Sequence, residues 1–210
     1  VGAPVAQTSV IDWNKGTNLV KYSNYFAAAG WTLGSANGGT TPTRTFNYAE
    51  APDGTQTATR FQMDRGTNAA GYSQMYQYPV NITSGQVHVY SVWAKSLSGT
   101  PTISIIGDAG RPAVTLTNEW ARYSGTYTPS NSLSQAEIAI FGSSYSAGNS
   151  QTADILVWGY QIENGSTLGA YIPNNGGTQI TTPVLLPAGL TTGRDITGVN
   201  LFENVRKQGA

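Results

Sequence analysis

A tyrosine-rich run in the first half of the chain has the residue types that bind sugars. The run Tyr-Ser-Gln-Met-Tyr-Gln-Tyr begins at Tyr72, so in a β-strand Tyr72, Gln74, Tyr76 and Tyr78 would share one face. Exposed aromatic rings stack on ligand rings, and amide and hydroxyl groups beside them hydrogen-bond to ligand hydroxyls. We therefore take Tyr72, Gln74 and Tyr76 as candidate glycan-binding residues.

Tyr145, in the loop 142–149, is a further candidate glycan-binding residue. The alternative for these tyrosines is a core position, with the hydroxyl at the rim of the sheet. Both interpretations stay open for Tyr72, Tyr76 and Tyr145, whereas we expect Tyr78 to belong to the core.

The residues available for catalysis are few. His88 is the only histidine, and it lies in a strand-like run where an ordinary structural role is expected. The chain has no G-x-S-x-G, H-E-x-x-H or phosphate-loop motif. A glycosidase needs only two carboxylates that face each other, but any two of the eleven in this chain could meet, so their presence carries little weight. We expect a protein that is not an enzyme.

The elements that would position these residues are short strands separated by turns. Charged residues make up only 10% of the chain and 25 residues are glycine, a composition poor in helix formers. Strand-like runs recur from Asn18 to Ile162, and no long stretch keeps a helical period. This pattern predicts an all-β antiparallel sandwich or barrel. Four tryptophans in or beside these runs are expected in the core: Trp31, Trp93, Trp120 and Trp158.

The run from Ile155 to Ile162 has apolar residues on both faces, which is typical of a central strand covered on two sides. Gly159 follows Trp158 within this run and indicates a bulge or a close approach of another backbone.

The charge balance excludes some partners. Eleven basic and eleven acidic residues give a formal net charge of zero, so nothing attracts the chain to nucleic acid or to an anionic membrane. Polar residues interrupt the longest uncharged stretches, and we expect no membrane insertion. With no cysteine, a disulfide framework and a thiolate metal site are both excluded. Low charge also removes one defence against association, which favours a place inside an assembly.

The chain divides into three predicted segments. Residues 1–17 are an N-terminal arm or linker, 18–177 form the sandwich, and 178–210 form an extended segment for oligomerisation or connection. The last segment is too short to bury a core alone, so we expect symmetry-related copies to bury its apolar groups in a homotrimer. These apolar residues are Ile180, Val184, Leu185, Leu186, Leu190, Ile196, Val199, Leu201, Phe202 and Val205.

Four passages carry a family signature in their order and spacing. They are NLVKYSNYF at 18–26 followed by Trp31, VYSVWAK at 89–95, EWARYS at 119–124, and ADILVWGYQIENG at 153–165 followed by YIP at 171–173. Together they resemble the carbohydrate-binding-module-like jelly rolls of bacteriophage tail, fibre and other virion appendage proteins. The resemblance covers roughly residues 18–175.

This resemblance implies a jelly-roll sandwich, a non-enzymatic role and a location in the virion. The partners it implies are other virion proteins and a bacterial surface glycan. It also raises a structural calcium ion as the one cofactor, with Asp154 as the candidate ligand. However, the acidic residue that the family places soon after Phe26 is replaced here by alanines, which argues against the family's calcium site.

Two hypotheses about the function follow, and they assign the chain to different classes of protein. The first is a structural appendage domain, in a fibre, a spike or a capsid decoration, that acts in assembly and host attachment. The alternative is a carbohydrate-binding module of a secreted polysaccharide-degrading enzyme. Fibre segments are usually homotrimers and enzyme-linked modules are usually monomers, so the oligomeric state discriminates between them.

Overall fold

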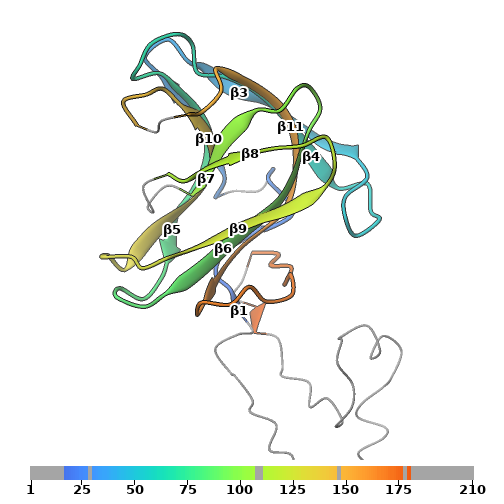
Figure 1. Cartoon of the computed structure of the whole chain (residues 1–210). Helices are drawn as coiled ribbons and strands as arrows, with labels where there is room; N and C mark the ends of the chain where they lie inside the picture. Colours follow the sequence, from blue (N-terminus) through green and yellow to red (C-terminus); the bar gives the residue numbers. More distant parts are fainter. Residues whose placement is uncertain (1–16, 28–29, 107–110, 146–147, 177–178, 181–210) are drawn as a thin grey trace, which may run out of the picture. The chain divides into compact units, whose positions relative to one another are not determined.

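Two five-stranded antiparallel sheets form the sandwich in the computed structural model (Figure 1). The structure describes residues 17–27, 30–106, 111–145, 148–176 and 179–180. The β5 sheet has the order β2 (Thr32–Ala36), β5 (Tyr72–Asn81), β10 (Leu133–Phe141), β7 (Thr102–Ile106) and β8 (Ala113–Thr115). The β11 sheet has the order β3 (Thr40–Ala49), β4 (Ala58–Asp64), β11 (Thr152–Asn164), β6 (His88–Ser96) and β9 (Ala121–Tyr127).

The interior between the sheets is filled by side chains from both of them. Phe61 and Tyr160 come from the β11 sheet, Met75 and Ile138 come from the β5 sheet, and each is at most 1% exposed. The Tyr160 hydroxyl donates a hydrogen bond to the Ile105 carbonyl, so the polar group of this buried ring is satisfied. The predicted all-β jelly-roll sandwich is confirmed, and the described residues contain no helix.

β11 is buried on both faces, as its sequence predicts. Every residue from Ile155 to Glu163 is buried. The pairing register with β6 shifts between Trp158 and Gln161, and Gly159 lies in this bulge with a positive φ of 65°. An added Cβ at Gly159 would lie 3.2 Å from the Trp93 ring, so the bulge also brings a side chain close to the backbone.

A short two-stranded sheet joins β1 (Thr17–Asn18) to β12 (Gln179–Ile180). Residues 14–181 form one compact unit. The predicted arm, 1–17, lies outside the described residues except for Thr17, and the predicted extended segment, 178–210, does so except for β12. Among the described residues, no helix is long and apolar enough to cross a membrane.

Candidate functional site

The outward side chains of β5 form the centre of the candidate site. Burial alternates along the strand, so Ser73 and Met75 are buried while Tyr72, Gln74 and Tyr76 are half-buried on the opposite face. The structure therefore brings three of the predicted glycan-binding residues onto one surface, with a glutamine between two tyrosines. We call the outward surface of β5 and β10, with Tyr145 and Arg111, the tyrosine face.

β2 provides a flat margin beside these side chains. In the pairing register, Gly34 of β2 lies opposite Gln74, and Thr32 lies opposite Tyr76. An added Cβ at Gly34 would lie 3.3 Å from Gln74 Nε2 and 3.6 Å from Tyr76 Cε1. Gln74 and Tyr76 therefore both approach the β2 backbone closely at Gly34, which has no side chain to hold them away.

An aromatic cluster closes one end of the tyrosine face. The ring of Tyr145 lies perpendicular to that of Tyr72 at 6.0 Å, and the Phe141 ring is 5.9 Å from Tyr72 and 5.6 Å from Tyr145. The Arg111 guanidinium lies 4.5 Å from the centre of the Phe141 ring and 5.6 Å from that of Tyr145. Edge-to-face rings and a stacked guanidinium hold the exposed Tyr145 ring in a defined position.

A buried carboxylate lies beside Tyr76 on the neighbouring strand. Glu137 of β10 is paired with Tyr76 of β5 in the register and is fully buried. Its Oε1 lies 3.7 Å from Arg111 Nε, and its Oε2 accepts a hydrogen bond of 2.5 Å from Gln135 Nε2. The Arg111 charge offsets the cost of burying this carboxylate, so the pair adds little net charge to the tyrosine face.

The chemistry that this arrangement supports is binding by stacking and hydrogen bonding. Half-buried tyrosine rings offer apolar surface, and Gln74 offers an amide donor and acceptor beside them. Among the described residues there is no group of three or more His, Cys, Asp or Glu side chains that could hold a metal ion. The Glu137 carboxylate is paired with the Arg111 guanidinium.

The segment 165–172, which we call the strap, covers part of the outer face of the β11 sheet, over β9 and the second half of β11. Gln161 donates to the Ala170 carbonyl at 3.1 Å and accepts from the Ile172 amide at 2.8 Å. Glu163 accepts from the Gly169 amide at 2.6 Å, and Arg122 donates to the Gly169 carbonyl at 2.7 Å. Side chains from two strands thus hold the backbone of the strap against the sheet.

Burial shifts the pKa values of Arg122 and Tyr171, at the contact between the strap and the sheet. Burial lowers the pKa of Arg122, and the neighbouring Glu163 carboxylate partly opposes that effect. Burial also raises the pKa of Tyr171, whose ring lies 4.6 Å from that of Trp158. The hydrogen bond that Tyr171 shares with the Ser23 hydroxyl, 2.6 Å long, acts in the opposite direction on this pKa. The strap is therefore closely packed against β9 and β11.

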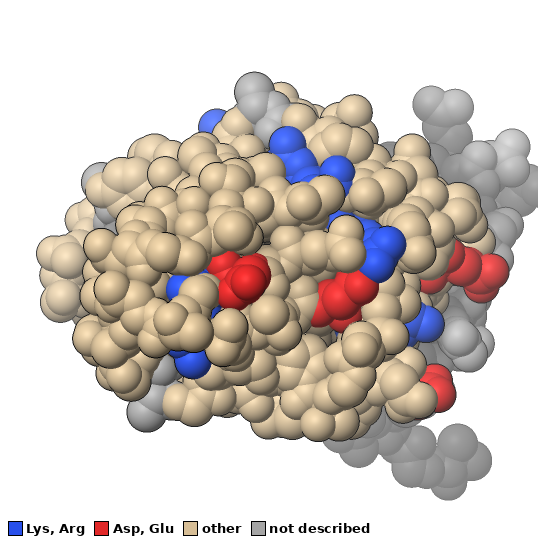
Figure 2. Space-filling model, turned by 90° about the horizontal axis from the view of Figure 1, so that it is seen from above, with Lys and Arg blue, Asp and Glu red and all other residues tan. Residues whose placement is uncertain are grey.

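The surface carries few charges. Figure 2 shows one face of the molecule, on which the lysine, arginine, aspartate and glutamate side chains lie in a few small groups separated by uncharged surface. This mostly uncharged surface matches the low content of charged residues in the sequence.

The burial of some residues differs from what the sequence predicted. Tyr78 was expected in the core, but it is 57% exposed, because β5 continues past the end of β2 and leaves its edge open there. Trp31 and Trp158 are buried as expected, whereas Trp93 and Trp120 are only partly buried.

Asp154 and His88, which the sequence analysis singled out, both have polar partners in the structure. Asp154 forms a bidentate pair with Arg60, with oxygen–nitrogen distances of 2.8 and 2.5 Å, so a calcium ion there would compete with a guanidinium. Its assignment as a metal ligand stays a prediction. His88 is buried, and its Nδ1 lies 2.9 Å from the Gln86 carbonyl.

Sequence reasoning missed Glu137, Arg111 and Phe141. Glu137 lies in the run Ser-Gln-Ala-Glu-Ile-Ala-Ile-Phe. Alternation along this run places Glu137 on one face of the strand and the apolar Ile138 and Ile140 on the other face. That signal marks an outward face on β10, but only the pairing register shows that the face adjoins the tyrosines of β5.

No protein-family model matches the chain, and no curated protein matches its sequence. Solved structures do resemble it. The family 11 carbohydrate-binding module from Clostridium thermocellum, in complex with a β-1,3-1,4-mixed-linked tetrasaccharide, is 12% identical with a TM-score of 0.49, and the match covers 73% of this chain and 98% of that one. The CBM22-1 xylan-binding domain of Paenibacillus barcinonensis Xyn10C is 16% identical with a TM-score of 0.46, and the match covers 74% of this chain and 99% of that one.

A phage protein is also among the similar structures. The enzymatically active domain of tailspike protein 4 from bacteriophage CBA120 is 17% identical with a TM-score of 0.43, over 70% of this chain. The match covers 21% of the tailspike chain, so the chain spans about a fifth of its length. In overall architecture the chain is thus similar to carbohydrate-binding-module jelly rolls and to part of a tailspike.

Proposed function

We propose that this chain is a non-enzymatic glycan-binding domain that uses the tyrosine face. The observation that carries the proposal is the shared outward surface of β5. Tyr72, Gln74 and Tyr76 are partly accessible on this surface, and the Tyr145 ring lies at its Tyr72 end. Stacking rings with an amide between them suit a neutral sugar chain that lies along β5.

The spacing of the two tyrosines along β5 supports this orientation of the sugar chain. Alternate residues of a strand are about 6.6–6.8 Å apart, so Tyr72 and Tyr76 are separated by roughly 13 Å along β5. Two rings at that separation can contact different sugars of one chain, with Gln74 between them to bind hydroxyl groups. The perpendicular Tyr145 ring limits the ligand at the Tyr72 end.

The test is affinity electrophoresis in gels that contain xylan, mixed-linkage β-glucan or a purified bacterial surface polysaccharide. We expect at least one of the three to retard the protein, and Tyr76→Ala to weaken that binding by about tenfold, which corresponds to ~1.4 kcal/mol. Tyr48→Ala is the control, because Tyr48 is an exposed tyrosine, 43% exposed, on the other sheet. Retardation that depends on Tyr48 and not on Tyr76 would place the site elsewhere, and no retardation by any of the three would contradict the proposal.

The absence of catalysis is part of the proposal and has its own measurement. Glu137 is engaged by Arg111 and Gln135, and the only histidine of the chain is buried in β6. We expect no new reducing ends when the protein is incubated with the polysaccharide that binds it. Release of reducing ends that Glu137→Gln abolishes would make the domain a glycosidase.

We place this domain in a phage virion appendage, where it acts in assembly and in contact with the host surface. The low charge and the apolar residues of 178–210 support a setting among other copies and other proteins. A carbohydrate-binding module of a secreted polysaccharide-degrading enzyme would use the same face. The two settings differ in the expected oligomeric state, which the last prediction below addresses.

A further inference from the structure

The tyrosine face is closed at one end by an exposed ring. Tyr145 is 41% exposed, and its ring lies perpendicular to the Tyr72 ring, with 6.0 Å between the two centres. A sugar that stacks flat on one of two perpendicular rings meets the other ring side-on. A sugar chain that lies along β5 and stacks on Tyr72 therefore cannot continue flat past Tyr145.

Backbone hydrogen bonds fix the segment that carries this ring. The amides of Gly142 and Ser144 donate to carbonyls of the residues just before β5, at 2.7 and 2.9 Å. The Tyr145 amide donates to the Gly142 carbonyl at 3.0 Å and closes a turn. The Phe141 ring and the Arg111 guanidinium support the side chain. The closed end is therefore preformed, and a ligand does not have to order it on binding.

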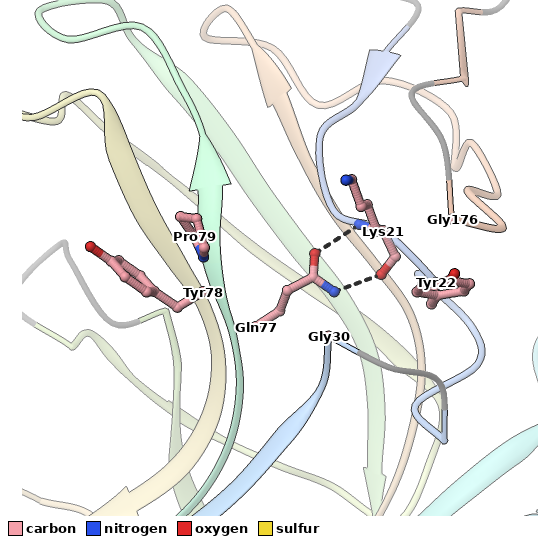
Figure 3. A pocket seen from close by; sticks show the side chains of 7 residues that line it. All are labelled: Lys21, Tyr22, Gly30, Gln77, Tyr78, Pro79 and Gly176. Carbon is pink, nitrogen blue, oxygen red and sulfur yellow. Dashed lines mark hydrogen bonds between the residues drawn. The ribbon is translucent and has the colours of Figure 1, made fainter.

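The opposite end of the face is open. The pairing with β2 ends at Tyr76, and the next residue on the outward side, Tyr78, is 57% exposed. Figure 3 shows the Gln77 side chain directed toward Lys21, and the Tyr78 ring turned away from both. Gln77 is buried and bonded to the Lys21 backbone at 2.9 and 2.8 Å, so Tyr78 lies on the other side of β5 and continues the row of Tyr72 and Tyr76.

We propose that the tyrosine face binds the end of a neutral sugar chain. The terminal sugar lies at Tyr72 against Tyr145, and the rest of the chain leaves past Tyr76 and Tyr78. This inference rests on the glycan binding proposed above. A face that is open at both ends can bind sugars anywhere within a chain, whereas a face closed at one end accepts a terminus, of either a main chain or a branch.

The test uses the three polysaccharides of the affinity gels, each of them intact and after mild acid hydrolysis. The hydrolysed form consists of oligosaccharides long enough to span the roughly 20 Å from Tyr72 to Tyr78 along β5. Hydrolysis multiplies the chain ends without changing the mass of sugar. In calorimetric titrations of the full chain, we expect the binding sites per gram of ligand to rise with the number of chain ends.

The outcomes separate this inference from the proposed function. An equal or smaller number of sites per gram after hydrolysis would overturn chain-end binding, while glycan binding itself would stand. If neither form of any of the three polysaccharides binds, the proposed function is contradicted and this inference with it.

Variants of Tyr145 test the closed end. Tyr145→Ala removes the ring that lies against Tyr72, so intact chains should bind along their length and hydrolysis should add no further sites per gram. Tyr145→Phe keeps the ring and should respond to hydrolysis as the wild type does. Tyr25→Ala is the matched control, since Tyr25 is also an exposed tyrosine that packs against an aromatic ring, that of Phe46.

Two results with a folded Tyr145→Ala variant would contradict the proposal. A response to hydrolysis that equals that of the wild type would mean that another group closes the face, or that none does. Loss of all binding would make the Tyr145 ring a stacking surface for the ligand rather than the barrier at its end.

The direction of the chain has its own measurement. We expect Tyr78→Ala to weaken the binding of the oligosaccharides about fivefold, because one stacked ring is lost. Binding of the corresponding disaccharide should be unchanged, since a disaccharide held at Tyr72 ends before Tyr78. Equal weakening of both ligands would place the terminal sugar at the open end, and no weakening of either would mean that the chain does not leave past Tyr78. Both results would overturn the proposal.

Discussion

Trp158 connects parts of the chain that are far apart in the sequence. Its indole Nε1 donates to the Thr57 hydroxyl at 3.1 Å, and its ring packs against Tyr171 of the strap. It belongs to a small hydrophobic cluster with Ala51 and Ala58, separate from the main core between the sheets. At the residue scale, Trp158 therefore stabilises the cover of the β11 sheet more than the interior of the sandwich.

We expect Trp158→Ala to lower the free energy of unfolding by ~3–5 kcal/mol, because the missing indole leaves a cavity beneath the strap. Trp158→Phe keeps an aromatic ring against Tyr171 and should cost less. Urea denaturation followed by circular dichroism measures both variants. A loss below about 1 kcal/mol for the alanine variant would mean that the strap closes over the cavity.

The strap is the element whose attachment depends most on buried polar groups. Arg122 Nη2 and Glu163 Oε2 have no hydrogen-bond partner among the described residues, although both atoms are buried. An added Cβ at Gly169 would lie 2.6 Å from Glu163 Oε2, so the strap approaches the carboxylate as closely as glycine allows. This packing makes the strap sensitive to the charge of the groups beneath it.

Alkaline pH should loosen the strap. Burial raises the pKa of Tyr171 above its ordinary value of about 10, so the folded state holds this proton more tightly than the unfolded state. The stabilisation from Tyr171 is therefore complete below pH ~10 and decreases as the pH rises from there through the folded pKa. Thermal unfolding measured from pH 8 to 11 should show a falling melting temperature.

Tyr171→Phe is the control for this dependence. It removes the titrating hydroxyl and the hydrogen bond to Ser23, so it should lower the melting temperature at pH 8 but reduce the slope above pH 10. Burial also raises the pKa values of Tyr90 and Tyr160, and part of the slope should therefore remain. An unchanged slope would assign the alkaline sensitivity to those two residues alone.

The elements show which features a sequence can reveal. Alternation predicted that Tyr72, Gln74 and Tyr76 share one face of β5 and that β11 is covered on both faces, because those patterns lie within one strand. The strap was not predictable, since Gln161 and Arg122 hold it through its backbone carbonyls and amides, which any sequence possesses. The neighbourhood of Glu137 and Tyr76 was hidden for a related reason, because it depends on the register of two strands about 60 residues apart in the chain.

At the scale of the whole molecule, the sandwich and the sequence that follows it differ in what they can bury on their own. The compact unit 14–181 satisfies its own core, with large side chains fully buried between the sheets. The sequence from 182 onward still contains nine large apolar residues, which are Val184, Leu185, Leu186, Leu190, Ile196, Val199, Leu201, Phe202 and Val205. Each would stabilise an assembly by about 1.5–3 kcal/mol if it became fully buried between chains.

We therefore expect the full chain to be a homotrimer and a chain that ends at residue 181 to be a monomer. This truncation keeps the β1–β12 pair, so the sandwich should stay folded, with an unchanged β-type circular dichroism spectrum. Cyclic symmetry lets the same apolar segment of each copy bury the others, and a three-fold axis suits an elongated appendage. Light scattering gives the masses directly. A full-length variant with Val184, Leu185 and Leu186 replaced by serine serves as the second test, because it should dissociate without any loss of chain length. If the full-length protein is itself a monomer, the assembly role loses its support and the enzyme-linked module becomes the better account of the same glycan-binding face.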